Sequence, residues 1–378
     1  AKMPQRCTII GGGGYFGQHV AREMQREGFH TVLLDLAFVD VDRDGFILDE
    51  RKLTRIRGSL LDQDLLEKAL KKSSVCIHIA AYGMSGAAAM DPGKIFEINV
   101  HGTMVAIQTC AKMNVSKFVL ASSVGVVFTD KELIDSPEDS PKPDSYYSHY
   151  SESKNDAEEF VLRANGAIVQ SCALRFRGIY GPGEPRATTR AAEAIAQGLY
   201  FAKFEKSRDA LTQFSGVDNS AKAMALASKA LFMKPEVVGG QAYTIVDGGD
   251  PVSSWGFWTP LIQTLGQKPP TWRIPYFLVI WGVYFVEVFY FFSKWFAPPL
   301  NQLEVNLMAI TNTYSIEKAR RDLGYDPQNN HDLKEVCEYY QRYFLAHPVQ
   351  VFDMPKILTH VLLFLASLLM AVLFFYFK

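Results

Sequence analysis

The stretch CTIIGGGGYFGQHVAREMQREGFHTVLLD, residues 7–35, places four consecutive glycines between two apolar runs. The first run, residues 8–10, is short and β-branched, and from Phe16 onward apolar residues recur at helical spacing. A second apolar run, residues 31–35, closes the unit. The stretch therefore predicts a strand, a tight turn, a helix and a second strand, which together form a βαβ crossover with the glycines at its first turn.

The glycines have a physical use at this turn. A helix N-terminus offers unpaired N–H groups and the positive end of its dipole to a pyrophosphate, provided that no side chain blocks the approach. The spacing G-x-x-G-x-x-G leaves that approach open. A glycine motif alone also fits a flexible turn, but the βαβ pattern around it favours a dinucleotide site. The residues expected to contact the cofactor in this loop are Gly11, Gly14, Tyr15, Phe16 and Gly17.

The end of the second strand predicts which dinucleotide binds. Asp35 stands where an acidic residue hydrogen-bonds the adenosine ribose hydroxyls and repels a 2′-phosphate, so we expect NAD rather than NADP. Arg43 could take a 2′-phosphate in principle, but it falls in the polar stretch DVDRDG. We therefore expect Arg43 to be a solvated loop charge.

Composition indicates a globular protein rather than a disordered one. The chain has 378 residues, of which 48% are hydrophobic and 21% charged, and its formal net charge is −1. Without a basic cluster, nucleic-acid binding has little support. The five cysteines are odd in number and widely spread, as expected for thiols in a reducing compartment. No cluster of His, Cys, Asp and Glu has metal-ligand spacing, so we predict no metal.

Strand-like runs alternate with helical patterns along the first half of the chain. Such runs recur at VCIHIAA, KFVLASS and SCALRF, the last ending at Phe176, and the alternation predicts an α/β fold with a Rossmann-type, doubly wound parallel sheet. The Gly- and Pro-rich stretch IYGPGEPR follows. We therefore expect an NAD-binding domain over residues 1–180 and a smaller C-terminal substrate lobe over residues 181–346, with some segments returning to the sheet.

One pair of residues suggests the chemistry. Tyr150 and Lys154 stand four apart, on one face of a predicted helix, and Tyr150 follows 27 residues after Ser123. Ser123 ends a predicted strand at the carboxyl edge of the sheet, where ligands of open α/β sheets bind. Two other Tyr–Lys pairs share the spacing, at residues 290–294 and 314–318, but neither follows a strand that ends in a hydroxyl. We expect those two to be structural.

These motifs together resemble a known family, the extended short-chain dehydrogenases/reductases. Within it the chain is similar to the 3β-hydroxysteroid dehydrogenase/isomerase group, most of all to its 42E members. The resemblance runs from about residue 8 to residue 344, and its motifs are GGGGYFG, HIAAYGMSG, NVHGT, ASSVGVVF, YSESK, IYGPGE and SIEKARRDLGYDP.

The resemblance also implies roles for individual residues. The implied catalytic group is Ser123, Tyr150 and Lys154, with Asn99 in support. The further residues implied to lie against the cofactor are Ala80, Ala81, Ser59, Lys154 and Phe176. Two of these depart from the family pattern, since Ser59 stands where relatives carry an Asp near the adenine and Phe176 replaces a Pro beside the nicotinamide.

The implied mechanism is the oxidation of a secondary alcohol, with Tyr150 as the base for the hydroxyl proton. A free phenol has a pKa near 10, but an ammonium about 4 Å away contributes roughly 4 kcal/mol at an effective dielectric of about 20. We therefore expect Lys154 to lower the pKa of Tyr150 towards about 7. Ser123 would orient the substrate oxygen, and Lys154 would also reach the nicotinamide ribose.

Three functions remain open at this point. The first is an NAD-dependent dehydrogenase of a 3β-hydroxysteroid or sterol in steroid biosynthesis or metabolism, with Δ5-Δ4 isomerisation as an optional second step. The second is a nucleotide-sugar epimerase or dehydratase, which uses the same nucleotide domain but expects a polar substrate lobe. The third is an NAD-binding scaffold that has lost turnover, although the intact Tyr150 and Lys154 argue against it. A homodimer is compatible with each of the three.

Two apolar stretches predict a membrane protein. Residues 357–377 carry no charge and as a helix would reach about 31 Å, which matches a hydrocarbon core of roughly 30 Å. Because no signal peptide precedes the first strand, we expect a C-terminal transmembrane helix that anchors a cytosolic catalytic domain at the endoplasmic reticulum. Residues 275–296 hold Glu287 near their centre, so we expect an interfacial helix with its polar stripe turned outward.

Overall fold

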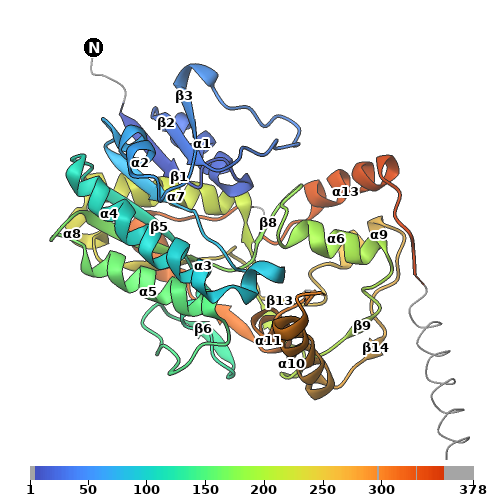
Figure 1. Ribbon diagram of the computed structural model, residues 1–378. Coiled ribbons are helices and arrows are strands. Elements are labelled where there is room, and N and C mark those ends of the chain that lie inside the picture. Colours follow the sequence, from blue (N-terminus) through green and yellow to red (C-terminus); the bar gives the residue numbers. More distant parts are fainter. Residues whose placement is uncertain (1–4, 296–297, 329, 353–378) are drawn as a thin grey trace, which may run out of the picture.

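The computed structural model describes residues 5–295, 298–328 and 330–352 (Figure 1). The transmembrane helix predicted at residues 357–377 lies outside the described residues. Within the described part, a parallel sheet of seven strands has the order β12-β7-β5-β4-β1-β2-β3. This is the predicted Rossmann-type sheet. Its strands are β1 (Arg6–Ile10), β2 (His30–Asp35), β3 (Leu53–Arg57), β4 (Val75–His78), β5 (Lys117–Ser123), β7 (Gln170–Phe176) and β12 (Ala242–Ile245).

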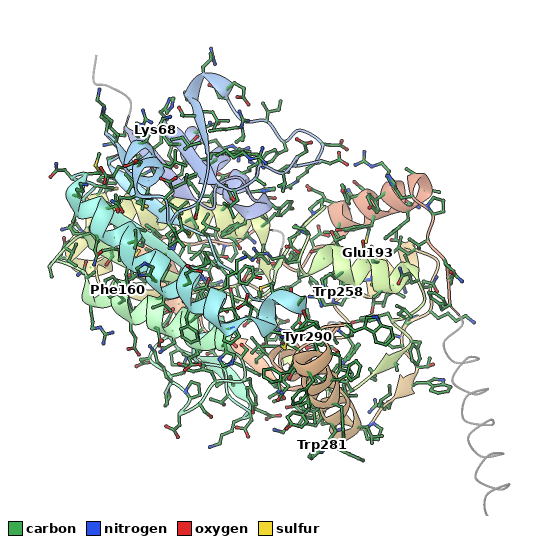
Figure 2. The ribbon with its side chains drawn as sticks, in the orientation of Figure 1. Lys68, Phe160, Glu193, Trp258, Trp281 and Tyr290 are labelled. Carbon is green, nitrogen blue, oxygen red and sulfur yellow. The ribbon has the colours of Figure 1, made fainter. Side chains whose placement is uncertain are left out.

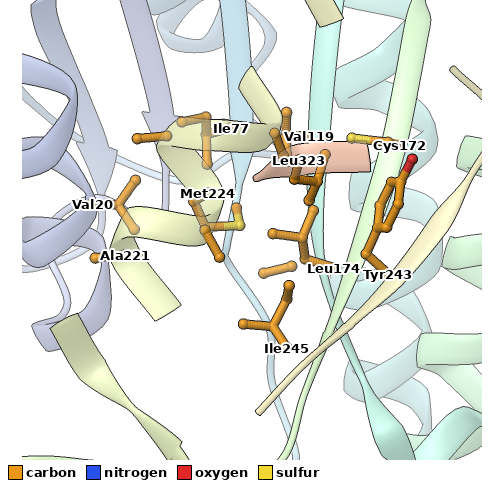
Figure 3. Close-up of a cluster of buried hydrophobic side chains, with 14 of the residues drawn as sticks. Val20, Ile77, Val119, Cys172, Leu174, Ala221, Met224, Tyr243, Ile245 and Leu323 are labelled. Carbon is orange, nitrogen blue, oxygen red and sulfur yellow. The ribbon is translucent and has the colours of Figure 1, made fainter. Parts of the chain in front are cut away.

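Helices cover both faces of the sheet because strands buried on both sides need an apolar layer above and below. Helices α1, α7 and α12 contribute to one buried cluster, which Figure 3 shows around Val20, Met224 and Leu174. Helices α2, α4 and α5 contribute to a second cluster on the opposite face. These six helices are α1 (Tyr15–Arg26), α2 (Gln63–Leu70), α4 (Gly102–Lys112), α5 (His149–Arg163), α7 (Val217–Met233) and α12 (Glu317–Leu323).

The sequence pattern did not predict strand β3, and it predicted a longer strand β4 than the structure has. Strand β3 pairs with β2 at the sheet edge, and its exposed Arg55 and Arg57 hide the apolar signal that marks the inner strands. Strand β4 ends at His78, earlier than the apolar run that predicted it. The chain leaves the sheet there, and residues 79–85 form neither helix nor strand.

A second lobe adjoins the carboxyl edge of the sheet (Figure 1). Three helices, α6, α9 and α13, share an apolar cluster with Tyr180 and Phe214. The remaining helices are α3 (Pro92–Phe96), α6 (Thr188–Ala196), α8 (Pro235–Val238), α9 (Thr259–Thr264), α10 (Tyr276–Ser293), α11 (Gln302–Ala309) and α13 (Lys334–Ala346), of which α8 packs on the sheet through Val238. The short strands are β6 (Leu133–Ser136), β8 (Ile179–Tyr180), β9 (Ala202–Lys203), β10 (Leu211–Thr212), β11 (Ser215–Gly216), β13 (Val252–Ser253), β14 (Trp272–Arg273) and β15 (Asn312–Tyr314).

Helix α10 is the one helix of the described residues that is long and apolar enough to cross a membrane, and none of it is buried. The predicted outward polar stripe is wrong at Glu287, which faces inward. Its carboxylate accepts from the backbone N–H of Gln302 at 3.1 Å and from the side-chain amide of Gln302 at 2.6 Å. Tyr284, which is 49% exposed, and Lys294 stay on the surface as expected.

Candidate active site

The glycine loop between β1 and α1 forms a tight cradle. A Cβ atom on Gly11, whose φ is +84°, would lie 2.5 Å from the backbone nitrogen of Ala80, and one on Gly17 would lie 2.3 Å from the carbonyl oxygen of Gly11. Gly14 precedes α1, and no side chain caps the N–H groups of the first turn. Free N–H groups at a helix N-terminus fit the pyrophosphate of a dinucleotide, so these residues fit the predicted cofactor.

Asp35 lies against this loop, but it already holds three hydrogen bonds. One carboxylate oxygen accepts from the N–H groups of Gly13 at 3.0 Å and Gly14 at 3.2 Å, and the other accepts from Leu36 N–H at 2.7 Å. A carboxylate has about four acceptor positions, so roughly one is left for a ribose hydroxyl. Asp35 therefore shapes the loop in addition to its expected contact with ribose.

Arg43 is not the solvated charge that the sequence predicted. Its guanidinium donates to both carboxylate oxygens of Asp218, at 2.9 and 2.7 Å, and to Glu335 at 2.6 Å, and its side chain is only 13% exposed. The two carboxylates come from α7 and α13, far away in sequence, so no local pattern could reveal them. With both partners engaged, Arg43 ties the loop after β2 to the second lobe.

Ser123 ends β5, and Lys154 reaches the same strand through the carbonyl oxygen of Ala121. The register pairs Ser123 with Phe176 of β7, and Tyr150 and Lys154 lie one turn apart on α5, both buried. The Ser123 hydroxyl oxygen accepts from Gly125 N–H at 3.1 Å, which leaves its own proton free to donate. Among the described residues no hydrogen-bond partner is found for the Tyr150 hydroxyl.

Lys154 does not bond to Tyr150. Its ammonium donates to the carbonyl oxygen of Ala121 at 2.7 Å and lies 6.0 Å from the centre of the Tyr150 ring. Burial, followed by the positive charge of Arg186, lowers the pKa of Lys154 to about 7, while Glu158 acts in the opposite direction. Lys154 is therefore poised between its charged and neutral forms near neutral pH.

The expected lowering of the Tyr150 pKa is not found. Burial raises the pKa of Tyr150 above its usual value of 10.0, and Arg186 opposes this effect. Desolvation penalises the charged forms of Tyr150 and Lys154 alike because both lie in the same buried site. The sequence reasoning did not single out Arg186, although it lies in the IYGPGEPR stretch that leads away from the sheet edge.

Asn99 clamps the segment beside the Tyr–Lys pair. Its side-chain oxygen accepts from Tyr82 N–H at 2.7 Å, and its side-chain nitrogen donates to the Tyr82 carbonyl and the Ser153 hydroxyl, each at 2.9 Å. Ser153 immediately precedes Lys154. Asn99 therefore positions both the loop after β4 and the helix that carries Tyr150.

His78 is a buried histidine with only one ring nitrogen paired. The Thr103 hydroxyl donates to the Asn99 carbonyl at 2.6 Å, so His78 Nε2 must donate to the Thr103 oxygen at 3.0 Å. Its Nδ1 is buried and finds no partner among the described residues. Burial, followed by the charge of Lys154, lowers the pKa of His78 to about 3. His78 is therefore a neutral core residue, only half satisfied.

The remaining predicted cofactor residues line the same edge. The rings of Phe16 and Phe176 meet edge to face, with their centres 5.2 Å apart. The Tyr15 hydroxyl is buried, finds no partner among the described residues, and lies where a Cβ on Gly181 would come within 2.6 Å. Gly58 donates to the Asp35 carbonyl at 2.9 Å, which brings the adjoining Ser59 to the same end of the sheet. Ala80 and Ala81 are half-buried beside the loop.

An apolar wall from α11 covers Tyr150. Leu303 and Ile310 are buried in one cluster with Tyr150 and Phe128, and Leu307 packs against it. The sequence predicted an apolar helix at residues 275–296 but no helix here. The spacing of Leu303, Leu307 and Ile310, four and then three residues apart, could have revealed it.

Comparisons with known proteins show the family of this chain. Residues 8–276 match the model of the 3-beta hydroxysteroid dehydrogenase/isomerase family. Short-chain dehydrogenase/reductase family 42E member 1 of Xenopus laevis is 35% identical over 355 residues, which are 90% of this chain and 89% of that protein. 3beta-Hydroxysteroid dehydrogenase/Delta(5)-Delta(4) isomerase 1 of Caenorhabditis elegans is 35% identical over 292 residues, 75% of this chain and 61% of that protein.

The fold recurs in solved structures. A UDP-glucose 4-epimerase from Thermus thermophilus, crystallised with NAD, superimposes with a TM-score of 0.64 over 89% of this chain and 99% of that one. Its sequence is only 18% identical, so the likeness shows the fold alone.

Proposed function

The chain belongs to the 3-beta hydroxysteroid dehydrogenase/isomerase family of extended short-chain dehydrogenases/reductases, and on that premise we propose that it is an NAD-dependent oxidoreductase that oxidises the 3β-hydroxyl of a steroid or sterol. The observation that carries the proposal is the position of Tyr150, which is buried against Leu303 and Ile310 and lies one helical turn from the buried Lys154. A sterol has one polar hydroxyl on an apolar ring system, so its hydroxyl suits Tyr150 and its rings suit the apolar side chains of α11.

In the proposed mechanism Tyr150 accepts the proton of the substrate hydroxyl, and Ser123 donates its free proton to the substrate oxygen to orient it. Bound NAD supplies the acceptor for the hydride. The acceptor form of Tyr150 is its phenolate, which becomes neutral when it takes up the proton. Lys154 in its charged form keeps two donors free after its bond to Ala121, and these suit the ribose hydroxyls and that phenolate. Asn99 holds the loop and helix that carry these groups.

In this proposal the two parts of the chain bind different molecules. Residues 1–180, together with the returning segments α7 and β12, bind the cofactor, and the lobe of residues 181–346 binds the substrate. A Δ5-Δ4 isomerisation after the oxidation would form no NADH, so analysis of the steroid product tests that step.

A nucleotide-sugar substrate is the competing proposal, and the apolar wall counts against it. A sugar brings several hydroxyls that would each lose hydrogen bonds with water against Leu303, Leu307 and Ile310. No comparable penalty applies to a sterol ring, which gains from burial.

The deciding experiment incubates purified protein with NAD and a panel of 3β-hydroxysterols and UDP-sugars, and follows NADH by absorbance. Tyr150→Phe should lower turnover by about 10² or more and leave NAD affinity nearly unchanged, because the ring still packs. The matched control, Tyr146→Phe, removes a phenol from the same segment and should stay active. Retention of more than about a tenth of the rate by Tyr150→Phe would refute the role of this residue.

We also propose that α10 lies in a membrane surface. Its exposed face is apolar, and Figure 2 shows Trp281 at the outer edge of the molecule. The large exposed residues of this helix are Phe277, Leu278, Trp281, Tyr284, Phe285, Val288, Phe289, Phe291 and Phe292. Arg273 precedes the helix and Lys294 follows it, so both ends offer a positive charge to lipid phosphates.

Fractionation tests the membrane binding of α10 separately from the predicted transmembrane helix at residues 357–377. Deletion of the residues after Pro355 should remove integral insertion and leave weaker peripheral binding through α10. If the full chain is extracted by alkaline carbonate, the transmembrane anchor is refuted. If the truncated chain is wholly soluble in neutral buffer, the interfacial helix is refuted.

A further inference from the structure

A charged cavity opens beside the first turn of α10. It has a volume of about 240 Å³, lies between β9, β14 and the start of the helix, and is lined by Lys203, Glu205, Arg273 and Tyr276. No step of the proposed dehydrogenase mechanism uses these residues. The cavity is therefore a second concave site, and its lining joins the exposed helix.

The two cations of the cavity keep their hydrogen-bond donors free. Lys203 Nζ lies 3.7 Å from one carboxylate oxygen of Glu205, and an Arg273 guanidinium nitrogen lies 3.8 Å from the other. Both distances exceed a hydrogen bond, and within the described ranges these three side chains form none. The Glu205 side chain is 10% exposed and that of Arg273 is 69% exposed, so the arginine can turn towards a ligand.

The cavity lies where a lipid headgroup would meet the protein. Tyr276, the first residue of α10, lines the cavity, so the apolar outer face of the helix begins at its rim. Trp272 precedes Arg273 on β14 and is exposed, as is common for tryptophan at a membrane–water boundary. Lys206 lies nearby, with its Nζ 5.8 Å from the centre of the Tyr276 ring, but it donates to the Asp130 carbonyl at 2.9 Å and is not part of the lining.

We propose that this cavity binds the headgroup of an acidic phospholipid that carries two anionic groups and one ammonium, as phosphatidylserine does. This proposal rests on the one made above, that α10 lies in a membrane surface. Two cations and one carboxylate complement that headgroup group by group. The Arg273 guanidinium suits the phosphate, Lys203 suits the headgroup carboxylate, and Glu205 suits the ammonium.

The test is a calorimetric titration of the full chain, dissolved in a non-ionic detergent, with dioctanoyl forms of phosphatidylserine, phosphatidylglycerol and phosphatidylcholine. Phosphatidylserine should bind the most tightly. Lys203→Ala and Arg273→Ala should each weaken its binding about fivefold, the usual effect of one basic residue near an anionic lipid. The matched control is Arg51→Ala, which removes an exposed cation from the nucleotide domain and should change nothing.

Glu205→Gln gives a result that misfolding cannot imitate. Loss of the carboxylate removes the partner of the serine ammonium and raises the positive charge of the cavity. Phosphatidylglycerol, which has no ammonium, should therefore bind more tightly than to the wild type, while the preference for phosphatidylserine should disappear.

Three results would overturn the proposal. Equal affinity of the wild type for phosphatidylserine and phosphatidylcholine excludes a headgroup site. That result would not contradict the proposal that α10 lies in a membrane surface. Equal affinity for the lipid and for glycerophosphoserine, which has no acyl chains, shows a site for a free phosphate ester. Equal weakening by Arg51→Ala and Arg273→Ala shows a general charge effect. NADH formation on the same samples reports the dehydrogenase independently, because lipid titration requires no turnover.

Discussion

Replacement of Lys154 by methionine should stabilise the fold below neutral pH while it removes activity. The Lys154 pKa falls from 10.5 to about 7 because burial disfavours the ammonium. A shift of about 3.5 units corresponds to about 5 kcal/mol of destabilisation when the residue is charged in both states. Methionine avoids this penalty but loses the bond to the Ala121 carbonyl, which costs about 1 to 3 kcal/mol.

The sign of the pH dependence follows from the depressed pKa. Between pH 7 and 10.5 the unfolded chain binds a proton that the folded chain does not, so wild-type stability rises with pH across that window. Below the window the full penalty applies. Lys154→Met should therefore exceed the wild type in unfolding free energy by about 3 kcal/mol near pH 6, and the difference should vanish by about pH 9.5.

Urea unfolding in non-ionic detergent, followed by tryptophan fluorescence at both pH values, measures this difference. The matched control is Lys222→Met, because Lys222 is exposed on α7 and its substitution should give the same difference at both pH values. A Lys154→Met difference that does not change with pH would contradict the reasoning. The NADH assay should show that the variant loses at least about 10² in rate, since it can no longer assist Tyr150.

Asp35→Ala should narrow the preference for NAD over NADP and weaken the binding of both cofactors, because the carboxylate also accepts from the N–H groups of the glycine loop. The ratio of the two catalytic efficiencies measures the preference, and an unchanged ratio would mean that another residue selects the ribose. Gly11→Ala should abolish NAD binding in a calorimetric titration, since its Cβ would lie 2.5 Å from the Ala80 nitrogen at a φ of +84°; retained binding would show that the loop can shift. Arg186→Ala should move the acidic limb of the kcat/KM profile to higher pH, because it removes the charge that lowers the Tyr150 pKa; an unmoved limb would place the base elsewhere.

The sequence by itself determined the nucleotide-binding half of this protein. Glycine spacing, the run that ends at Asp35 and the strand that ends at Ser123 are local patterns, and each is set by the backbone geometry of a few neighbouring residues. The pairing of Ser123 with Phe176 came only from the structure, because local patterns give neither the order of the strands nor their register. Edge strand β3 was not predicted, because its exposed arginines interrupt the apolar pattern that marks a strand.

The environments of the charged residues were decided only by the tertiary structure. Arg43 meets Asp218 and Glu335, Glu287 turns inward to Gln302, and Arg186 acts on the Tyr–Lys pair from another segment. Such contacts join residues far apart along the chain, and each depends on which surfaces the fold brings together. The pKa of a buried group depends in the same way on the desolvation that its neighbours impose, and a spacing of four residues on a helix carries no information about that.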